Sequence, residues 1–467
     1  MSTSNNTRST SDPTPEELAL QKRLKEQLKE HLKQLSRAIV RKPPYCQGTI
    51  HLPADDFTLF YGKDAIARRL NFSNASPEEL QHLAETCDPA TFGLGGEDVY
   101  DETYRKAGKL DASDFLLRFT PEAVGLLDVI RAELLVEGRN STKSIRAELY
   151  KLNVYGPEAF FKAHVDTPRS ELMFGSLVIV FPTAHEGGAL NLRERDAENA
   201  QEWTFDSAAL LAQAAQPSIA YVAFYSDVEH EVMPVQSGHR VTVTYNLYYA
   251  EDAASLPAAQ PVPTNEHTFR TKVQALLDDP TFLPEGGNLM FPLRHQYPMS
   301  KTPKSDAKAR RALKDVATRL KATDALVLKV MRDLSLDASL KIVYQDSGAV
   351  LGGPHYVMCD RVVRLEDRYE VQESLYEHLL REEGGVLLNP GRWEDKYLGA
   401  YALPRAQVHW IGAPIAWHVN STKTTYMVYG NQHEMAHTYW KISMYVRVGP
   451  VGNRATASEV GVAPSEN

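Results

Sequence analysis

A histidine and an aspartate two residues apart are the first candidates for chemistry in this chain. In the segment Phe161–Asp166, His164 is followed by Val165 and then by Asp166. Residues i and i+2 of a strand point to the same face, so both side chains can enter one cavity. Among the fifteen histidines, only His164 has an acid at the second position after it. Alone, the pair is equally compatible with surface residues beside a strand. A further histidine would complete the two-imidazole, one-carboxylate ligand set of non-haem iron.

That further histidine precedes a glycine turn and an arginine. His230 is followed by Gly238 and then by Arg240, which opens a β-branched run. We expect a return hairpin that brings His230 to the metal and Arg240 to the far end of a dicarboxylate. A guanidinium suits that task because it can form two parallel hydrogen bonds with a carboxylate. Thr242 shares the strand face of Arg240 and can add a hydroxyl donor. Without the histidines, an exposed strand arginine would be the simpler interpretation.

The order of these residues resembles the prolyl 4-hydroxylase-like branch of the 2-oxoglutarate/Fe(II) dioxygenases. The shared pattern is His164-x-Asp166, then His230, then Arg240 ten residues later. The segment ending in Tyr155-Gly156 resembles the family strand whose tyrosine contacts 2-oxoglutarate. The resemblance spans about residues 149–249.

One turn departs from the family pattern. Gly187-Gly188-Ala189-Leu190 resembles the family's Gly-Gly-Glu-Thr turn, but Ala189 stands where the glutamate is usual. The resemblance therefore implies no role for this position.

The resemblance implies a reaction and two sets of site residues. Fe(2+), 2-oxoglutarate and O2 are the implied cofactors and co-substrates, and succinate and CO2 are the co-products of substrate hydroxylation. Halogenating relatives have a small residue at the position of Asp166, so its presence favours hydroxylation. The implied iron ligands are His164, Asp166 and His230, and the implied 2-oxoglutarate contacts are Arg240, Tyr155 and Thr242.

Substrate contacts are predicted from the region ahead of the barrel, which often borders the substrate in the resembling family. Tyr104 and Arg105 lie there, and Arg169 follows Asp166 by three residues. A solvated mixed-charge surface is the alternative for the first two. The substrate is predicted to be a protein or peptide side chain or a small metabolite. The competing function is a catalytically silent jelly-roll binding module, against which the complete ligand set argues.

The segment His433–His437 matches the HExxH pattern of zinc proteases. That pattern requires one helix, so that both histidines share a face. A turn signal at 429–431 precedes the segment, and the strand-like run Tyr439–Val448 follows it. Because hardly two helical turns fit between them, we do not expect a protease.

Short strand-like runs dominate the middle of the chain, separated by Gly, Pro and Asp clusters. Their close spacing favours an antiparallel sandwich or jelly roll. We predict an α+β fold, namely a double-stranded β-helix (jelly roll) with flanking helices, plus a mixed α/β C-terminal region. The expected strands are Leu149–Tyr155, Leu172–Phe181, Ala189–Arg193, Ile219–Phe224 and Arg240–Tyr248.

Composition shifts divide the chain into segments. Thr14-Pro15-Glu16-Glu17 predicts a helix start with a capping box, and leucines then recur at helical spacing until Pro43. We expect this helix to lie against the catalytic domain rather than form a coiled coil, because the stripe is short. The predicted segments are 1–13 disordered tail, 14–42 amphipathic helix, 43–250 dioxygenase domain, 251–267 linker, 268–450 C-terminal non-catalytic domain and 451–467 disordered tail.

The composition of the 467 residues is that of a globular protein, with 43% hydrophobic and 24% charged residues. No run approaches the about 20 apolar residues that span a membrane, and the polar start lacks the apolar stretch of a secretory signal. We therefore predict a cytoplasmic or nuclear location and no membrane partner. A net charge of −9 without a basic run gives no indication of nucleic-acid binding. Three scattered cysteines predict neither disulfides nor a thiolate metal site. The oligomeric state stays open.

Overall fold

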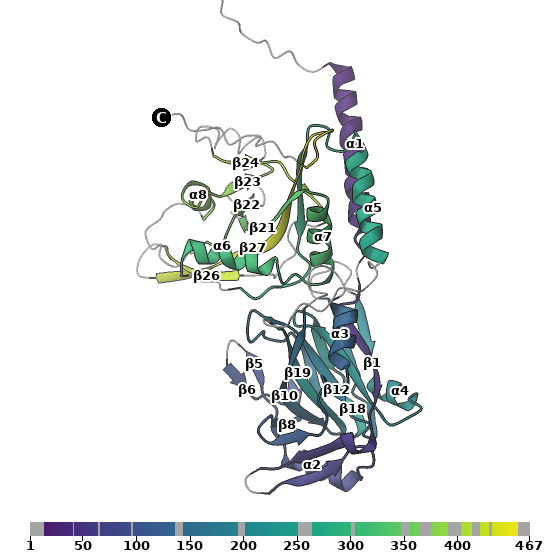
Figure 1. The fold of residues 1–467 in the computed structure, drawn as a ribbon. Helices are drawn as coiled ribbons and strands as arrows, with labels where there is room; N and C mark the ends of the chain where they lie inside the picture. Colours follow the sequence, from purple (N-terminus) through teal and green to yellow (C-terminus); the bar gives the residue numbers. More distant parts are fainter. Residues whose placement is uncertain are drawn as a thin grey trace, which may run out of the picture.

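The structure is a computed structural model with an N-terminal and a C-terminal part (Figure 1). The N-terminal part contains the strands between residues 45 and 249, and the C-terminal part lies above it in this view. The structure describes residues 14–40, 42–63, 66–94, 97–135, 143–194, 201–250, 264–299, 304–346, 355–363, 375–390, 403–412, 421–428 and 432–455.

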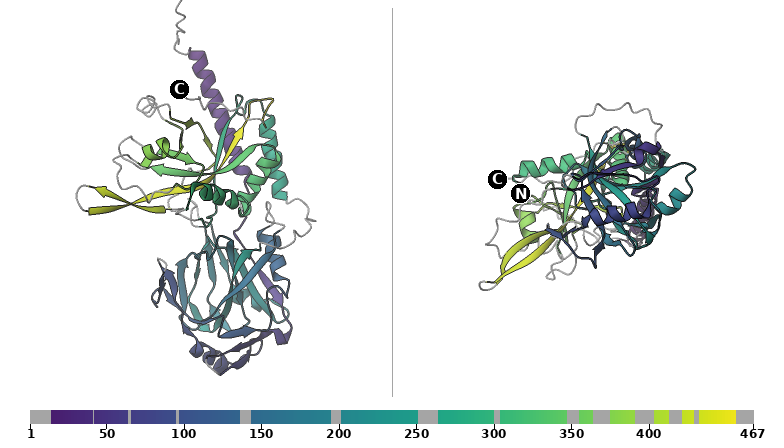
Figure 2. Two further views of the ribbon diagram at one scale, coloured as in Figure 1. Left: turned by 60° about the vertical axis from the view of Figure 1, so that its left-hand side comes forward. Right: turned by 90° about the horizontal axis from the view of Figure 1, so that it is seen from below.

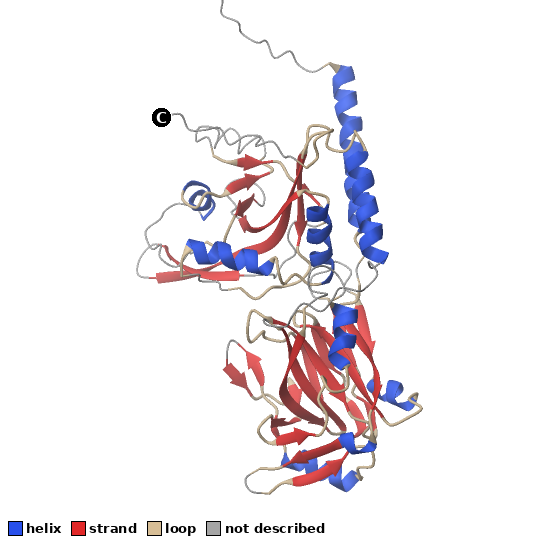
Figure 3. Ribbon diagram, in the orientation of Figure 1, coloured by secondary structure: helices blue, strands red, loops and turns tan. Residues whose placement is uncertain are grey.

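Two sheets with only antiparallel pairing form the N-terminal part (Figure 3). The seven-stranded sheet has the order β1 (Tyr45–His51), β16 (Ser218–Tyr225), β12 (Met173–Val180), β19 (Arg240–Tyr249), β10 (Ile145–Tyr155), β8 (Gly108–Asp111) and β4 (Asp88–Pro89). The five-stranded sheet has the order β15 (Glu202–Phe205), β14 (Leu190–Arg193), β17 (Glu229–Val232), β11 (Phe160–His164) and β7 (Arg105–Lys106).

Smaller sheets and helices surround these two sheets. The small sheets are β13 (His185–Gly187) with β18 (Val235–Gly238), β3 (Arg68–Asn71) with β2 (Thr58–Tyr61) and β9 (Phe115–Leu117), and β5 (Phe92–Leu94) with β6 (Glu97–Val99). The helices are η1 (Ala54–Phe57), α2 (Pro77–Thr86), α3 (Leu126–Leu134) and α4 (Ser207–Ala212).

The apolar runs in the sequence form the central strands of the larger sheet. Every residue of β16 is buried. Both faces of this strand are covered, as expected for a strand without polar alternation. All five expected strands are present, with ends that differ by a few residues. One continuous hydrophobic core includes residues of both sheets, such as Leu177 and Leu192.

The C-terminal part combines a mixed sheet with helices and has its own hydrophobic core. The sheet pairs β20 with β25 and β23 with β24 in parallel and its other neighbours antiparallel. Its strands are β20 (Gly287–Pro292), β21 (Asp337–Asp346), β22 (His355–Cys359), β23 (Val386–Leu388), β24 (Arg405–Ala406), β25 (His409–Trp410), β26 (Ser421–Val428) and β27 (Gln432–Val448). Its helices are α5 (Thr264–Asp278), α6 (Asp306–Val316), α7 (Ala322–Asp333) and α8 (Leu375–Arg381).

The N-terminal helix α1 (Pro15–Ala38) begins with the predicted capping box between Thr14 and Glu17. Its position differs from the expectation, because it lies beside α5 and not against the dioxygenase sheets (Figure 1). Leu35 belongs to the C-terminal core, against which Leu28 and Leu32 also pack. The apolar stripe of α1 therefore covers the C-terminal part.

Several boundaries differ from the prediction. Helix α5 begins within the predicted linker, whose residues 251–263 lie outside the described residues. Arg454 anchors the chain beyond residue 450 through hydrogen bonds to the carbonyls of Leu277 and Phe282. Residues 1–13 and 456–467, which form most of the two predicted tails, also lie outside the described residues.

The HExxH segment lies in β27, which pairs with β26 in a ribbon that projects from the C-terminal part (Figure 2). The zinc-protease pattern requires a helix, so this segment does not form a zinc-protease site.

In the part of the chain that the structure describes, none of the helices has the length and hydrophobicity of a membrane span.

Candidate functional site

A cavity that opens to solvent lies between the two sheets of the N-terminal part, and its empty space, with the opening included, is about 620 Å³. Both sheets contribute to it, because the inner faces of β10, β12 and β19 oppose those of β11, β14 and β17. Its polar lining includes all three predicted metal ligands and all three predicted 2-oxoglutarate contacts. These six residues are His164, Asp166, His230, Arg240, Tyr155 and Thr242.

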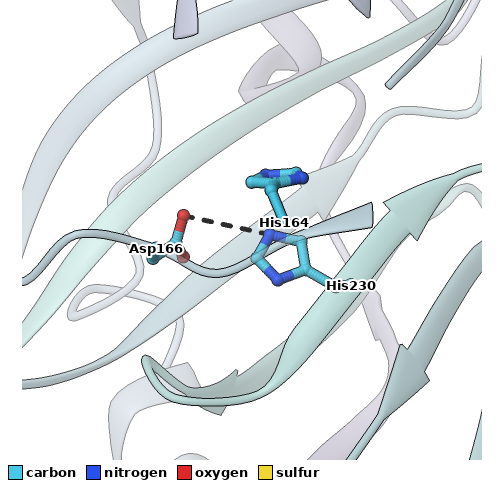
Figure 4. Close-up of side chains that lie close together, drawn as sticks. All are labelled: His164, Asp166 and His230. Carbon is cyan, nitrogen blue, oxygen red and sulfur yellow. Dashed lines mark ion pairs between the residues drawn. The ribbon is translucent and has the colours of Figure 1, made fainter. Parts of the chain in front are cut away.

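The metal-ligand candidates converge on one point (Figure 4). One ligand atom from each of His164, Asp166 and His230 lies within 4.8 Å of the other two. The two histidines face each other across paired strands, because His164 ends β11 and is in register with His230 of β17. Nε2 of His230 lies 3.9 Å from Oδ1 of Asp166. This spacing fits a single metal ion held on one face by two imidazoles and a carboxylate.

Hydrogen bonds orient both imidazoles for binding a metal through Nε2. Nδ1 of His164 lies 2.8 Å from the carbonyl oxygen of Lys162, and Nδ1 of His230 lies 3.0 Å from that of Val228. A carbonyl can only accept, so each Nδ1 carries the proton and each Nε2 keeps its lone pair. Burial and the neighbouring His230 hold the pKa of His164 well below its ordinary value. The ring is therefore neutral at physiological pH, as a metal ligand must be.

Asp166 is oriented by a residue that the sequence analysis missed. It follows the end of β11, so the strand alternation expected for His164 and Asp166 does not continue to it. Instead, the buried Ser176 of β12 donates a hydrogen bond of 2.5 Å to Oδ2 of Asp166. The signal in the sequence was a lone hydroxyl inside the apolar run Met173–Val180. Oδ1 stays on the side of His230.

Among the described residues, Arg240 is the largest of the fully buried side chains, with 1% of its surface exposed. Nε and Nη2 have no hydrogen-bond partner among the described residues. Arg240 is paired in register with Tyr155, and its Cζ lies 5.6 Å from the centre of that ring. Burial lowers the pKa of Arg240 to about 10, which leaves the guanidinium charged at neutral pH. A buried cation without a partner is costly, so the site fits an anionic ligand.

The turn that contains Gly187 and Gly188 leaves space for the side chain of Arg240. A Cβ on Gly188 would lie 2.7 Å from Cδ of Arg240, closer than side-chain atoms approach one another. Gly188 also has a φ of +69°, which favours glycine. Thr242 lies two residues after Arg240 on the same strand and is 2% exposed. Arg240 and Thr242 both line the cavity, where they offer hydrogen-bond donors to a small carboxylate.

The return hairpin predicted between His230 and Arg240 is wrong. Strand β17, with His230, pairs with β11 and β14, whereas β19, with Arg240, pairs with β10 and β12. The two strands therefore belong to opposite sheets. The chain crosses between them through β18, and the two residues meet across the cavity rather than along a hairpin.

Of the three predicted substrate contacts, one lines the cavity and two do not. Arg105 lines the cavity and is held there by Asn153, whose Oδ1 accepts from Nη2 at 2.8 Å, and by the ring of Phe161 at 4.3 Å. Tyr104 and Arg169 lie outside the lining that the described residues form. The Tyr104 hydroxyl donates to the carbonyl of Ala163, next to His164.

Arg169 packs on a residue that lines the cavity. Its guanidinium lies 4.3 Å from the centre of the Tyr150 ring, and Tyr150 lines the cavity together with Lys151. Both residues lie on β10, at the end of the cavity away from Tyr155. Tyr150 and Lys151 were not predicted from the sequence, although strand alternation from Tyr155 indicates that Lys151 shares its face.

One comparison with known proteins assigns a family to part of this chain. Residues 150–248 match the sequence model of the 2OG-Fe(II) oxygenase superfamily. The search of curated proteins found no significant match. Similar solved structures include a prolyl-4-hydroxylase from Pseudomonas putida, with 19% identity over 46% of this chain and 100% of that chain and a TM-score of 0.28. Another is a Trichoplax adhaerens prolyl hydroxylase in complex with a hypoxia inducible factor oxygen degradation domain peptide, with 17% identity over 51% and 94% and a TM-score of 0.26.

Residues 150–248 form a 2OG-Fe(II) oxygenase domain, so this part of the chain is that of a 2-oxoglutarate-dependent non-haem iron dioxygenase. The resemblance stated from the sequence is confirmed at this level. Fe(II), 2-oxoglutarate and O2 are the cofactors and co-substrates of this class. The matched segment contains His164, Asp166, His230 and Arg240.

Proposed function

We propose that this enzyme hydroxylates a protein or peptide side chain or a small metabolite, with succinate and CO2 as co-products. His164, Asp166 and His230 hold Fe(II), and Arg240 binds the distal carboxylate of 2-oxoglutarate, assisted by Thr242 and Tyr155. The two sheets correspond to a double-stranded β-helix within residues 43–250. The observation that carries the proposal is the buried Arg240, whose Nε and Nη2 have no hydrogen-bond partner among the described residues, in the cavity that also contains the three converging ligand candidates.

The protein's own residues have distinct tasks in this reaction. Fe(II) with 2-oxoglutarate supplies the oxidising chemistry, and the protein supplies geometry and exclusion of water. The carbonyls of Lys162 and Val228 fix the imidazole tautomers, and Ser176 fixes the carboxylate. The apolar lining, such as Phe224 and Val232, keeps bulk water away from the reacting atoms.

The substrate is assigned to the end of the cavity opposite Arg240. Tyr150 and Lys151 line that end, and Arg105 lies in the lining beside Phe161. Arg105 is the direct substrate contact in this proposal. Arg169 acts by holding Tyr150, and Tyr104 acts by holding β11 next to His164.

The test is Fe(II)-dependent conversion of 2-oxoglutarate to succinate by the purified protein. We expect turnover by the wild type, even without a substrate, and none by Asp166→Ala or His230→Ala, because each variant loses an iron ligand. His51→Ala, which changes an exposed histidine of β1, is the control and should retain turnover. Normal turnover by the ligand variants would refute the site. Iron binding by the wild type without any consumption of 2-oxoglutarate would favour a silent binding module.

A further inference from the structure

The turn that carries one candidate iron ligand is held by the C-terminal part of the chain. Asp227 lies between β16 and β17, and Nζ of Lys321 lies 2.6 Å from its Oδ1. Nδ1 of His295 lies 3.0 Å from Oδ2, to which the backbone N–H of Gln296 also donates at 3.0 Å. Lys321 and His295 are both buried. Burial alone would raise the pKa of Asp227, but Lys321 and His295 hold it well below its ordinary value, so the group is a carboxylate.

This turn also orients the ligand. Asp227 precedes His230 by three residues, and between them the carbonyl of Val228 accepts the Nδ1 proton of His230. The N–H of Val228 in turn donates to the carbonyl of Tyr225 at 3.0 Å. The position of the Val228 carbonyl therefore depends on how the turn is fixed at Asp227.

A second contact from the C-terminal part involves the segment that follows Asp166. Arg319 and Lys321 both lie in the connection between α6 and α7. Nη1 of Arg319 donates to the carbonyl of Glu171 at 2.6 Å, and Nη2 lies 3.2 Å from its carboxylate. Glu171 follows Asp166 by five residues. The loop between α6 and α7 thus contacts two segments of the iron site. One follows Asp166, and the other precedes His230.

We propose that the C-terminal part is a clamp on the iron site, in which Lys321 is a positioning residue for His230 and Arg319 is one for the segment after Asp166. The inference rests on the proposed iron ligation. Buried ion pairs add little net stability but can specify one geometry, and contacts behind metal ligands tune metal affinity. The C-terminal part is then not a separate recognition module, because the iron site is incompletely held without it.

The test compares Lys321→Met with Arg361→Met in the full chain. Arg361 is a matched control, because it is a buried cation paired with carboxylates inside the C-terminal part, away from the turn. Fe(II) affinity is measured anaerobically with 2-oxoglutarate present, below the melting temperature of each variant. We expect Lys321→Met to weaken Fe(II) binding about tenfold and Arg361→Met to leave it unchanged. Hydrogen exchange at the amides of Val228 and His230 should become faster only in Lys321→Met.

Two further variants separate positioning from simple loss of structure. Lys321→Arg keeps the cation and should restore most of the affinity. Asp227→Asn combined with Lys321→Met leaves no unpaired buried charge, so it should fold even where the single variant does not, and it should still bind iron weakly. If the folded Lys321→Met variant or the folded double variant has wild-type Fe(II) affinity and wild-type hydrogen exchange, the proposed clamp is wrong. The proposed iron ligands would not be affected by that result. Failure of the wild type to bind Fe(II) would overturn the proposed function as well.

Discussion

Buried cations in the two parts of the chain have opposite surroundings. In the C-terminal part, Nη2 of Arg361 lies 2.7 Å from a carboxylate oxygen of Glu383 and 3.1 Å from one of Asp306. In the N-terminal part, Arg240 is more deeply buried, yet Nε and Nη2 find no partner among the described residues. The first cation is neutralised by the fold itself. The second has two nitrogens without a partner among the described residues, as is expected of a cation that binds an anionic ligand.

The largest effect should come from breaking the structural pair. Arg361→Met removes the guanidinium beside the largely buried carboxylate of Glu383 and leaves His378, with Nε2 at 3.2 Å, as its ion-pair partner. We expect the free energy of unfolding to fall by about 3–5 kcal/mol, the usual cost of removing one partner of a buried pair. Urea denaturation measures this change. An unchanged unfolding free energy would show that the pair is not structural and would break the comparison.

Arg240→Met should have the opposite profile. Without 2-oxoglutarate the variant should be at least as stable as the wild type, because no carboxylate in the described part of the chain loses a partner. Affinity for 2-oxoglutarate should fall on the order of 100-fold, since two charge-assisted hydrogen bonds of about 1.5 kcal/mol each are lost. Calorimetric titration with anaerobic Fe(II) measures this affinity. Arg146→Met, an exposed arginine on β10, is the control. Equal losses of iron and 2-oxoglutarate affinity would contradict the role of Arg240.

A smaller effect is expected at Ser176. Ser176→Ala removes the hydrogen bond to Oδ2 of Asp166 and frees the carboxylate to rotate. Fe(II) affinity should fall about tenfold, as is usual when a residue behind a metal ligand is lost. Ser218→Ala is a matched control, because Ser218 is a buried serine of the same sheet that donates to the carbonyl of Gln216. The same decrease in both variants would indicate a general loosening of the sheet.

The elements around the site could be predicted because their sequence signals are local. The apolar run of β16 and the capping box of α1 depend on neighbouring residues, and both elements were located correctly. Which strands pair depends on contacts between distant segments, so β17 and β19 were wrongly joined in a hairpin. The C-terminal surface that covers α1 is equally distant in sequence, so its packing partner was also missed.

The candidate site residues stand out in the sequence for a different reason. His164, His230 and Arg240 are recognisable by type and order, and the cavity contains all three. The residues that hold them were not recognisable, because Ser176 and Lys321 are ordinary residue types whose partners lie 10 and 94 positions away. These positioning residues can be identified only from the folded structure.

The most direct test of the site is an anaerobic titration of the protein with Fe(II) and 2-oxoglutarate, followed by the metal-to-ligand charge-transfer absorption. We expect a saturable band with one Fe(II) and one 2-oxoglutarate per chain. The band should be absent in His230→Ala and should require much higher 2-oxoglutarate concentrations in Arg240→Met. A folded wild-type protein that shows no such band would contradict the assignment of His164, Asp166, His230 and Arg240.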